Sequence, residues 1–357
     1  MEKKVAITQA FYNKLVADME TFSYKKENGE YKQNDFFTTV IINTYKYRSI
    51  NEQSIATTIK NILLDKDNKL ANNEIISSIK ENKDDPYFNN NITDLVTLLS
   101  NKEFNVEIPS KHNCKNIFIR STIKNDDLLQ EIINSSVDLP SASIFRNLLY
   151  EYMSYPMYVR EKILFLDNYL KLMFLKENNL TCLLESKKTY LNRKTNKKYH
   201  NYFEFKLFDV VVGKEEYHYY VVGIGKNTNN KYDESIMSFK LSSINKVIAN
   251  KITYSLNNYQ LNEIKDKLTK GPEWISGIHE EIKVEFSEYG ITLFEALYKD
   301  RPIPSKKEDN IYYFNCSENS IINYLKPFGR HANVIYPLKC KEKLLDFYKK
   351  AYDKYNQ

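Results

Sequence analysis

Hydrophobic and polar residues alternate at the start of the chain and then recur with helical spacing. In KKVAIT, Val5 and Ile7 share one face of a short strand, and the residues between them share the other. Thr8 is a suitable N-cap for a helix over QAFYNKLVADMETF, and Asn34 for a second helix over DFFTTVIINTYKYR. One strand and two helices cannot bury their apolar faces alone, and the strand has unpaired edges. We therefore expect residues 1–50 to dimerise through antiparallel pairing of two such strands.

This order of elements resembles a ribbon-helix-helix domain, whose paired strands enter the major groove of DNA. The resemblance implies that Lys4, Ala6 and Thr8 face the bases. It places Lys3 and the start of the second helix near phosphates. The alternative is that KKVAIT is a short edge strand of a larger helical domain.

Residues 51–165 are expected to form a helical connector. The segment INEQSIATTIKNILL has a helical apolar stripe, and Asp84-Asp85-Pro86 is typical of a helix end. Farther along, NIFIRST is typical of a strand, whereas NDDLLQEIINSS and SASIFRNLLYEYMS are typical of helices. In the last of these helices, the side chains expected to face inward are Phe145, Leu148, Leu149 and Tyr152.

The second half of the chain is richer in strands. Within residues 166–255 a helix leads into the strand-like segments LTCLLES, KKYHNYFEFKLFDVVV, EEYHYYVVGIG and ESIMSFKLSSINKVIA. Long strands joined by short turns predict a small barrel or a strongly bent sheet. Residues 278–357 alternate between strands and helices, from EIKVEF to the closing helix KEKLLDFYKKAYDKY. The expected fold class is therefore a multidomain α+β protein.

The segments YYVVG, FKLSSI and YYFNCSENSIINYLKPFGRHANVIYP together resemble a WYL-domain protein. That family is named for consecutive Trp-Tyr-Leu residues on a strand of an Sm-like, SH3-type β-barrel, and Tyr219, Tyr220 and Val221 take those places. Residues 240–244 (KLSSI) correspond to the family's arginine-containing strand. The resemblance implies a barrel over 166–255 and a C-terminal α+β extension over 278–357. It also includes a branch in which a ribbon-helix-helix start precedes the WYL domain.

Two departures from the family concern charge. Lys240 stands in place of the first arginine of the family's strand, and Ser243 in place of the second. Arginine binds phosphate or carboxylate through two parallel hydrogen bonds, whereas lysine acts as a point charge. The resemblance implies a ligand-binding site that includes Tyr219, Tyr220 and Lys240, with altered chemistry toward an anion.

The stretch KKTYLNRKTNKKYH has six basic residues and no acidic one. Cations can follow phosphates while aromatic rings stack on unpaired bases, a combination suited to single-stranded nucleic acid. The alternative is a solvated hairpin tip whose lysines prevent edge-to-edge aggregation. The nucleic-acid interpretation assigns phosphate contacts to the cations and ligand stacking to Tyr190 and Tyr199; the cations are Lys187, Lys188, Arg193, Lys194, Lys197 and Lys198.

Composition excludes few function classes. The net charge of +6, from 52 basic and 46 acidic residues, permits nucleic-acid binding without requiring it. The four cysteines and five histidines have neither zinc-ligand nor disulfide-framework spacing, so we expect no metal and no cofactor. There is no apolar run of membrane-spanning length and no signal peptide at the start, which predicts a cytoplasmic protein without membrane association.

Two regulatory functions follow from these resemblances. The leading prediction is a homodimeric, DNA-binding transcriptional regulator whose WYL barrel senses a nucleotide or nucleic-acid ligand. The alternative is an accessory protein that binds single-stranded RNA and stimulates an RNA-targeting CRISPR effector nuclease. An enzyme is a remote third possibility, since the sequence has no Gly-rich phosphate loop and no nucleophile elbow; Asp126-Asp127 is explained by helix capping. We therefore expect a protein that is not an enzyme.

Overall fold

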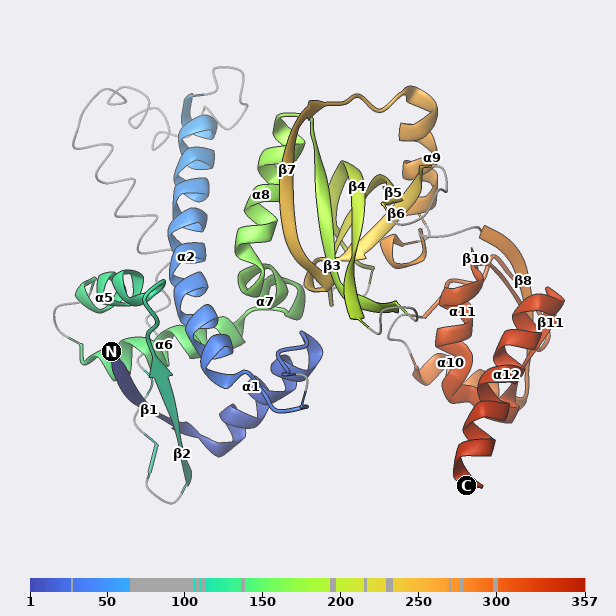
Figure 1. Cartoon of the computed structure of the whole chain (residues 1–357), viewed down its shortest axis with the longest axis horizontal. Helices are drawn as coiled ribbons and strands as arrows, with labels where there is room; N and C mark the ends of the chain where they lie inside the picture. The colour runs from blue at the N-terminus through green and yellow to red at the C-terminus, as the bar shows by residue number, and fades with distance from the viewer. Residues whose placement is uncertain are drawn as a thin grey trace. The chain divides into compact units, whose positions relative to one another are not determined.

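The computed structural model describes residues 1–26, 28–64, 106, 109–110, 113–135, 139–192, 197–214, 217–228, 234–269, 271–275, 279–297 and 301–356. The chain divides into two compact units, Met1–Leu166 and Asp167–Gln357 (Figure 1). No helix in these described ranges is long and apolar enough to cross a membrane. The elements of the first unit are β1 (Glu2–Thr8), α1 (Gln9–Thr21), α2 (Gln33–Leu64), β2 (Cys114–Arg120), α5 (Asp126–Asn134), α6 (Ser141–Ser154) and α7 (Met157–Leu164).

The first unit has one hydrophobic core to which both the N-terminal elements and the following segment contribute. Val5 and Ile7 are fully buried, as alternation along the strand predicts. The predicted inward stripe of α6 is confirmed, because Phe145, Leu148, Leu149 and Tyr152 are at most 2% exposed. This core also contains the buried residues of α1 and α2. Residues 1–50 and 51–165, which the sequence suggested as separate parts, thus share a core.

The pairing of β1 differs from the intermolecular ribbon that the sequence suggested. β1 pairs antiparallel with β2 of the same chain, from Glu2 opposite Arg120 to Thr8 opposite Cys114. The backbone carbonyl of Ala6 also accepts a hydrogen bond from Nε of Arg146, at 2.8 Å. One edge of β1 is therefore occupied within the chain, and the ribbon-helix-helix arrangement is not confirmed. Alternation showed that the strand needs a partner but could not show which strand supplies it.

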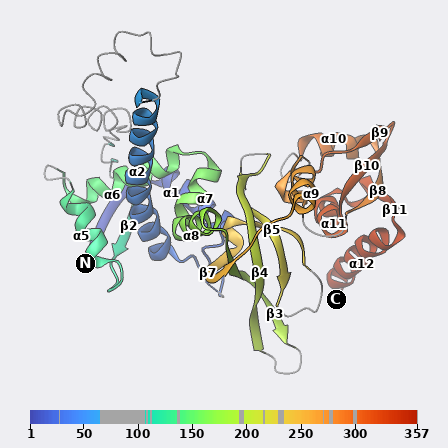
Figure 2. The same ribbon diagram turned by 90° about the horizontal axis from the view of Figure 1, so that it is seen from above.

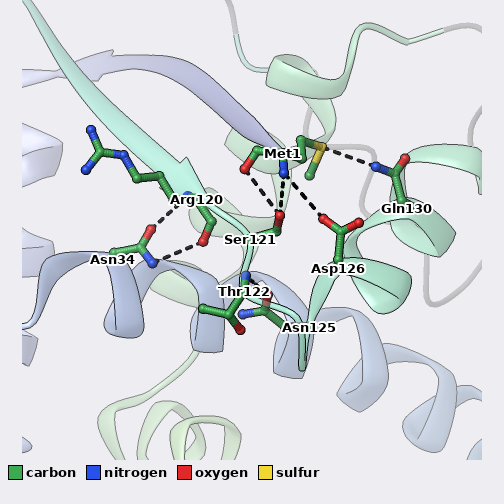
Figure 3. A network of polar contacts seen from close by, with 8 residues as sticks. All are labelled: Met1, Asn34, Arg120, Ser121, Thr122, Asn125, Asp126 and Gln130. Atoms are coloured by element: carbon green, nitrogen blue, oxygen red, sulfur yellow. Dashed lines mark hydrogen bonds and ion pairs between the residues drawn. The ribbon is translucent and has the colours of Figure 1, made fainter.

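A network of polar contacts fixes the end of this two-strand ribbon (Figure 3). The side chain of Asn34 accepts from the backbone N–H of Arg120 at 2.8 Å and donates to its carbonyl at 3.0 Å. The amino terminus of Met1 donates to Oγ of Ser121 at 2.6 Å and pairs with the carboxylate of Asp126 at 3.5 Å. The predicted N-cap at Asn34 is therefore wrong, because α2 begins at Gln33 and the Asn34 side chain binds β2 instead.

The second unit begins with a helix and a five-stranded antiparallel sheet. Its elements are α8 (Leu166–Glu177), β3 (Leu180–Asn192), β4 (Lys197–Val212), β5 (Tyr219–Asn227), β6 (Ser235–Lys240), the 3-10 turn η3 (Leu241–Ser243) and β7 (Ile244–Thr253). The strand order is β6-β5-β4-β3-β7, so the last strand returns to pair with the first. β3 and β4 project together beyond the other strands (Figure 2).

Close contact across this sheet requires glycine in β5. A Cβ atom at Gly223 would lie 2.1 Å from the carbonyl oxygen of Lys206 and 2.8 Å from the ring of Phe205. A Cβ atom at Gly225 would also lie 2.8 Å from the Phe205 ring. The two glycines therefore let the buried Phe205 ring of β4 lie against the backbone of β5.

α9 (Asn258–Leu268) packs on the five-stranded sheet, since its buried Ile264 shares a core with Val222 and Ile236 of β5 and β6.

The elements after α9 form a smaller α+β part with a separate core. They are η4 (Pro272–Trp274), β8 (His279–Phe286), α10 (Glu288–Ala296), β9 (Lys306–Glu308), β10 (Ile311–Ser317), α11 (Glu318–Leu325), η5 (Lys326–His331), β11 (Ala332–Tyr336) and α12 (Leu338–Tyr355). The sheet order is β11-β8-β10-β9. Alternate residues Ile282, Val284 and Phe286 are fully buried, so one face of the sheet packs on the core. The strand and helix alternation expected for residues 278–357 is confirmed.

Candidate functional site

The pairing of β5 with β6 brings together two of the ligand-binding residues suggested by the sequence. Tyr220 lies directly opposite Lys240, and Nζ of Lys240 is 6.0 Å from the centroid of the Tyr220 ring. This distance is at the limit at which a cation and an aromatic face attract each other. Lys240 is the last residue of β6, since the η3 turn begins at Leu241. Its side chain is therefore held at a strand end, beside an aromatic ring.

The Tyr220 ring is fixed by the hairpin that precedes β5. The backbone N–H of Gly213 donates to the carbonyl of His218 at 2.9 Å and closes that hairpin. A Cβ at Gly213 would lie 2.8 Å from the Tyr220 ring, so the absence of a side chain there makes room for the ring. The His218 ring meets the Tyr220 ring edge-on at a centroid distance of 6.4 Å. Tyr220 is consequently 5% exposed and has little rotamer freedom.

Both residues line a cavity of about 390 Å³ in the second unit. The other walls come from η4, which contributes Glu273 and Trp274, and from α11, which contributes Asn323 and Tyr324. A cavity of this size is within the range that binds small ligands.

The lining combines aromatic rings with groups that hydrogen-bond or carry charge. Tyr220, Trp274 and Tyr324 are each at most 8% exposed and provide apolar surface. The hydroxyl of Tyr324 donates to the carbonyl of Leu297 at 2.8 Å, which fixes the orientation of its ring. Lys240 adds a positive charge, Glu273 adds a carboxylate, and Asn323 adds an amide that both donates and accepts. Such a site suits a planar ligand that presents an anionic group to Lys240 and hydrogen-bond donors to Glu273.

Tyr219 has a different environment from Tyr220, because neighbouring residues of a strand point to opposite faces. Its ring packs against Tyr169 of α8, with ring centroids 5.8 Å apart. Tyr220 lines the cavity, whereas Tyr219 is not one of its lining residues. The two tyrosines suggested together by the sequence are therefore separated by the pleat.

The basic hairpin is formed by the ends of β3 and β4. Tyr190 lies directly opposite Tyr199, and Tyr199 is 40% exposed. Lys188 is exposed and Lys187 is half-buried on β3. The backbones of Lys197 and Lys198 pair with Asn192 and Leu191. Arg193 and Lys194 lie outside the described residues, as do the side chains of Tyr190, Lys197 and Lys198.

The residues suggested for DNA contact lie on the β1–β2 ribbon. Lys4 is exposed, and Lys3 and Ala6 are half-buried. The Thr8 hydroxyl accepts a hydrogen bond from the backbone N–H of Phe11 at 3.2 Å, which confirms its role as the N-cap of α1. The Thr8 hydroxyl oxygen, suggested by the sequence for DNA contact, therefore already accepts a hydrogen bond within the chain.

The sequence interpretation missed the cavity residues on η4 and α11. Trp274 is the single tryptophan of the chain and follows Gly271-Pro272, a typical turn signal that could have drawn attention to it. Asn323 and Tyr324 carry no such signal, because they lie within an ordinary amphipathic helix.

No three His, Cys, Asp or Glu side chains converge on a possible metal position in the part of the chain that the structure describes. Asp126 pairs with the amino terminus, and Asp84-Asp85 lies outside the described residues.

Comparison with known proteins shows that the whole fold is similar to that of a solved structure. No protein-family model matches the chain, and no curated protein does. The crystal structure of a CRISPR Cas-related protein superposes with a TM-score of 0.63 at 18% identity, covering 100% of this chain and 94% of that one. Proteasome accessory factor B/C of Arthrobacter aurescens aligns over 68% of this chain and 37% of its own, with a TM-score of 0.23 and 8% identity. The chain therefore has the multidomain α+β fold of a CRISPR Cas-related protein.

Proposed function

We propose that this chain is an accessory protein of a CRISPR system that binds single-stranded RNA and stimulates an RNA-targeting effector nuclease. It acts as a cytoplasmic homodimer, and the cavity beside Lys240 binds a nucleotide unit of the ligand. The observation that carries the proposal is the pairing of Tyr220 with Lys240 at a cavity that also contains Trp274 and Tyr324.

The topology of the five-stranded sheet supports a WYL-type barrel within this proposal. A helix precedes the strands, a 3-10 turn separates β6 from β7, and β7 returns to β3. An Sm-like or SH3-type barrel has this arrangement. The match in fold to a CRISPR Cas-related protein over the full chain supports the same interpretation.

The chemistry of the cavity favours a nucleotide over a purely apolar ligand. Aromatic rings stack on any base because every base has a π-face. The ammonium group of Lys240 is a point charge suited to a phosphate, although it cannot form the two parallel hydrogen bonds of an arginine. The aromatic walls and the lysine thus match the base and the phosphate of one nucleotide.

The test is to replace Lys240 with glutamine and to measure the affinity for a labelled, unstructured RNA by fluorescence anisotropy. Loss of one charge-assisted contact should weaken binding about tenfold. Lys246→Gln is the matched control, since Lys246 is an exposed lysine of β7 outside the cavity lining. Unchanged affinity of the Lys240 variant would contradict the proposal. Thermal melting of both variants separates loss of binding from loss of folding.

A DNA-binding transcriptional regulator is the second candidate, because Lys4 is exposed on the β1–β2 ribbon. In that case duplex DNA should bind more than tenfold tighter than single-stranded RNA across a salt titration. Lys4→Glu should then abolish duplex binding without changing the oligomeric state.

The proposal also assigns no catalytic step to the chain itself. RNA incubated with the purified protein and a divalent metal should stay intact, whereas adding the protein to an RNA-targeting effector should raise the rate of RNA cleavage. Cleavage that disappears when a single acidic residue is replaced would identify an enzyme instead.

A further inference from the structure

The β1–β2 ribbon has an outward face that contributes nothing to the core of the first unit. The register places Lys4 opposite Phe118, Ala6 opposite Asn116 and Glu2 opposite Arg120 on this face. The intervening residues Ile117 and Ile119 are at most 3% exposed, whereas Phe118 is 47% exposed. The strand therefore alternates as expected, with an aromatic ring at an outward position.

The charge of the ribbon suits a polyanion. Its outward face carries the cations Lys4 and Arg120 and the single carboxylate of Glu2, whereas Lys3 and Lys115 lie in register with the buried Ile119 and Ile7. Glu2 pairs with Arg120 at 3.4 Å, but both side chains are more than half exposed. An exposed pair of this kind contributes little to stability, so Arg120 can exchange its partner for a phosphate.

The backbone of the ribbon is fixed before any ligand binds. The Asn34 side chain hydrogen-bonds to both the N–H and the carbonyl of Arg120. The amino terminus of Met1 contacts Ser121 and Asp126 (Figure 3). The backbone N–H of Ser121 also donates to the carbonyl of Met1, at 2.9 Å. A surface that is already ordered loses less conformational entropy on binding.

We propose that this outward face is a second contact for single-stranded nucleic acid, in which an unpaired base stacks on Phe118 while the neighbouring phosphates contact Lys4 and Arg120. This inference rests on the proposed RNA-binding function and adds a surface in the first unit to the cavity in the second. A single strand is favoured over a duplex, because the bases of a duplex are already stacked and cannot cover the exposed ring.

The experiment compares Phe118→Ala with the unmodified full chain by fluorescence anisotropy on a labelled, unstructured RNA. Loss of one stacked base should weaken binding at least fivefold. Phe118→Trp keeps an aromatic face and should retain the affinity. Ile123→Ala is the matched control, since Ile123 is a fully exposed apolar residue just beyond β2 and should have no effect.

A second measurement does not depend on the stability of the variants. Ultraviolet cross-linking of the unmodified protein to RNA, followed by mass spectrometry, should identify the peptide that contains Phe118. Affinity of Phe118→Ala within about twofold of the unmodified chain, with no cross-link on that peptide, overturns the inference.

The outcomes also separate this inference from the proposed function. If Lys240→Gln weakens RNA binding and Phe118→Ala does not, the ribbon contact is wrong and the proposed function stands. If the unmodified chain binds no RNA, both are wrong. A loss of duplex DNA binding alone in Phe118→Ala overturns the single-stranded contact and supports the DNA-binding candidate.

Discussion

A buried carboxylate holds three helices of the first unit together. Asp18 of α1 is 2% exposed and accepts two hydrogen bonds from Nη1 of Arg160, each at 2.9 Å, and one from the Tyr152 hydroxyl at 2.8 Å. Burial raises the pKa of Asp18, and its contacts with Arg160 and Tyr152 partly offset that rise. A packing of α1, α6 and α7 that separated Asp18 from its partners would leave an uncompensated buried charge, which is strongly destabilising. The cluster therefore restricts how these three helices can pack.

The four cysteines should differ sharply in reactivity, although sequence spacing treats them alike. Cys182, Cys316 and Cys340 are buried, and burial raises the pKa of the Cys182 thiol to about 12. At pH about 8 its reactive thiolate is then about one part in ten thousand. Iodoacetamide should modify the partly exposed Cys114 in the native protein and the other three only after unfolding. Mass spectrometry measures this pattern, and rapid labelling of Cys182 in the native state would contradict it.

The stability of a strand depends on close backbone contacts as well as on its side chains, and β5 shows this at Gly223. Gly223→Ala should destabilise the protein by at least about 2 kcal/mol, because the added Cβ would overlap the Lys206 carbonyl and the Phe205 ring. Ser235→Ala is the matched control, since Ser235 is an exposed residue of the neighbouring β6 and its replacement should change stability by less than about 0.5 kcal/mol. Chemical denaturation measures both changes. Equal stability of the two variants would show that the strands separate easily at this position.

Periodicity predicted most elements but not their long-range pairing. The segment predicted as KKYHNYFEFKLFDVVV coincides with β4, because alternation and flanking turn residues both identify a strand. Residues 35–48 and the following helical stripe are one helix, α2, since no Gly or Pro interrupts them. α9 was missed because its single fully buried residue, Ile264, gives little apolar periodicity. The partner of β1 lies in a strand more than a hundred residues away, which no local pattern identifies.

For the whole molecule, the candidate site could be predicted only in part. Tyr220 and Lys240 followed from a resemblance along β5 and β6, and the sheet brings them together. The remaining cavity walls come from η4 and α11, which lie far along the chain and join the site only through tertiary packing. The Asp18 cluster has the same origin, because its partners are 134 and 142 residues away.

The two proposed RNA contacts belong to different units, since Phe118 is in Met1–Leu166 and Lys240 is in Asp167–Gln357. Effects of substitutions at distant, independent sites add within about 0.5 kcal/mol. On an RNA long enough to reach both contacts, the loss of binding free energy in Phe118→Ala/Lys240→Gln should therefore equal the sum of the two single losses. On an RNA of only a few nucleotides, which occupies one contact at a time, the double variant should lose more than that sum, because each single variant still binds the RNA through its intact contact. Anisotropy titrations of the four proteins on both RNAs measure the coupling, and additive losses on the short RNA would show that the two residues act on one shared site.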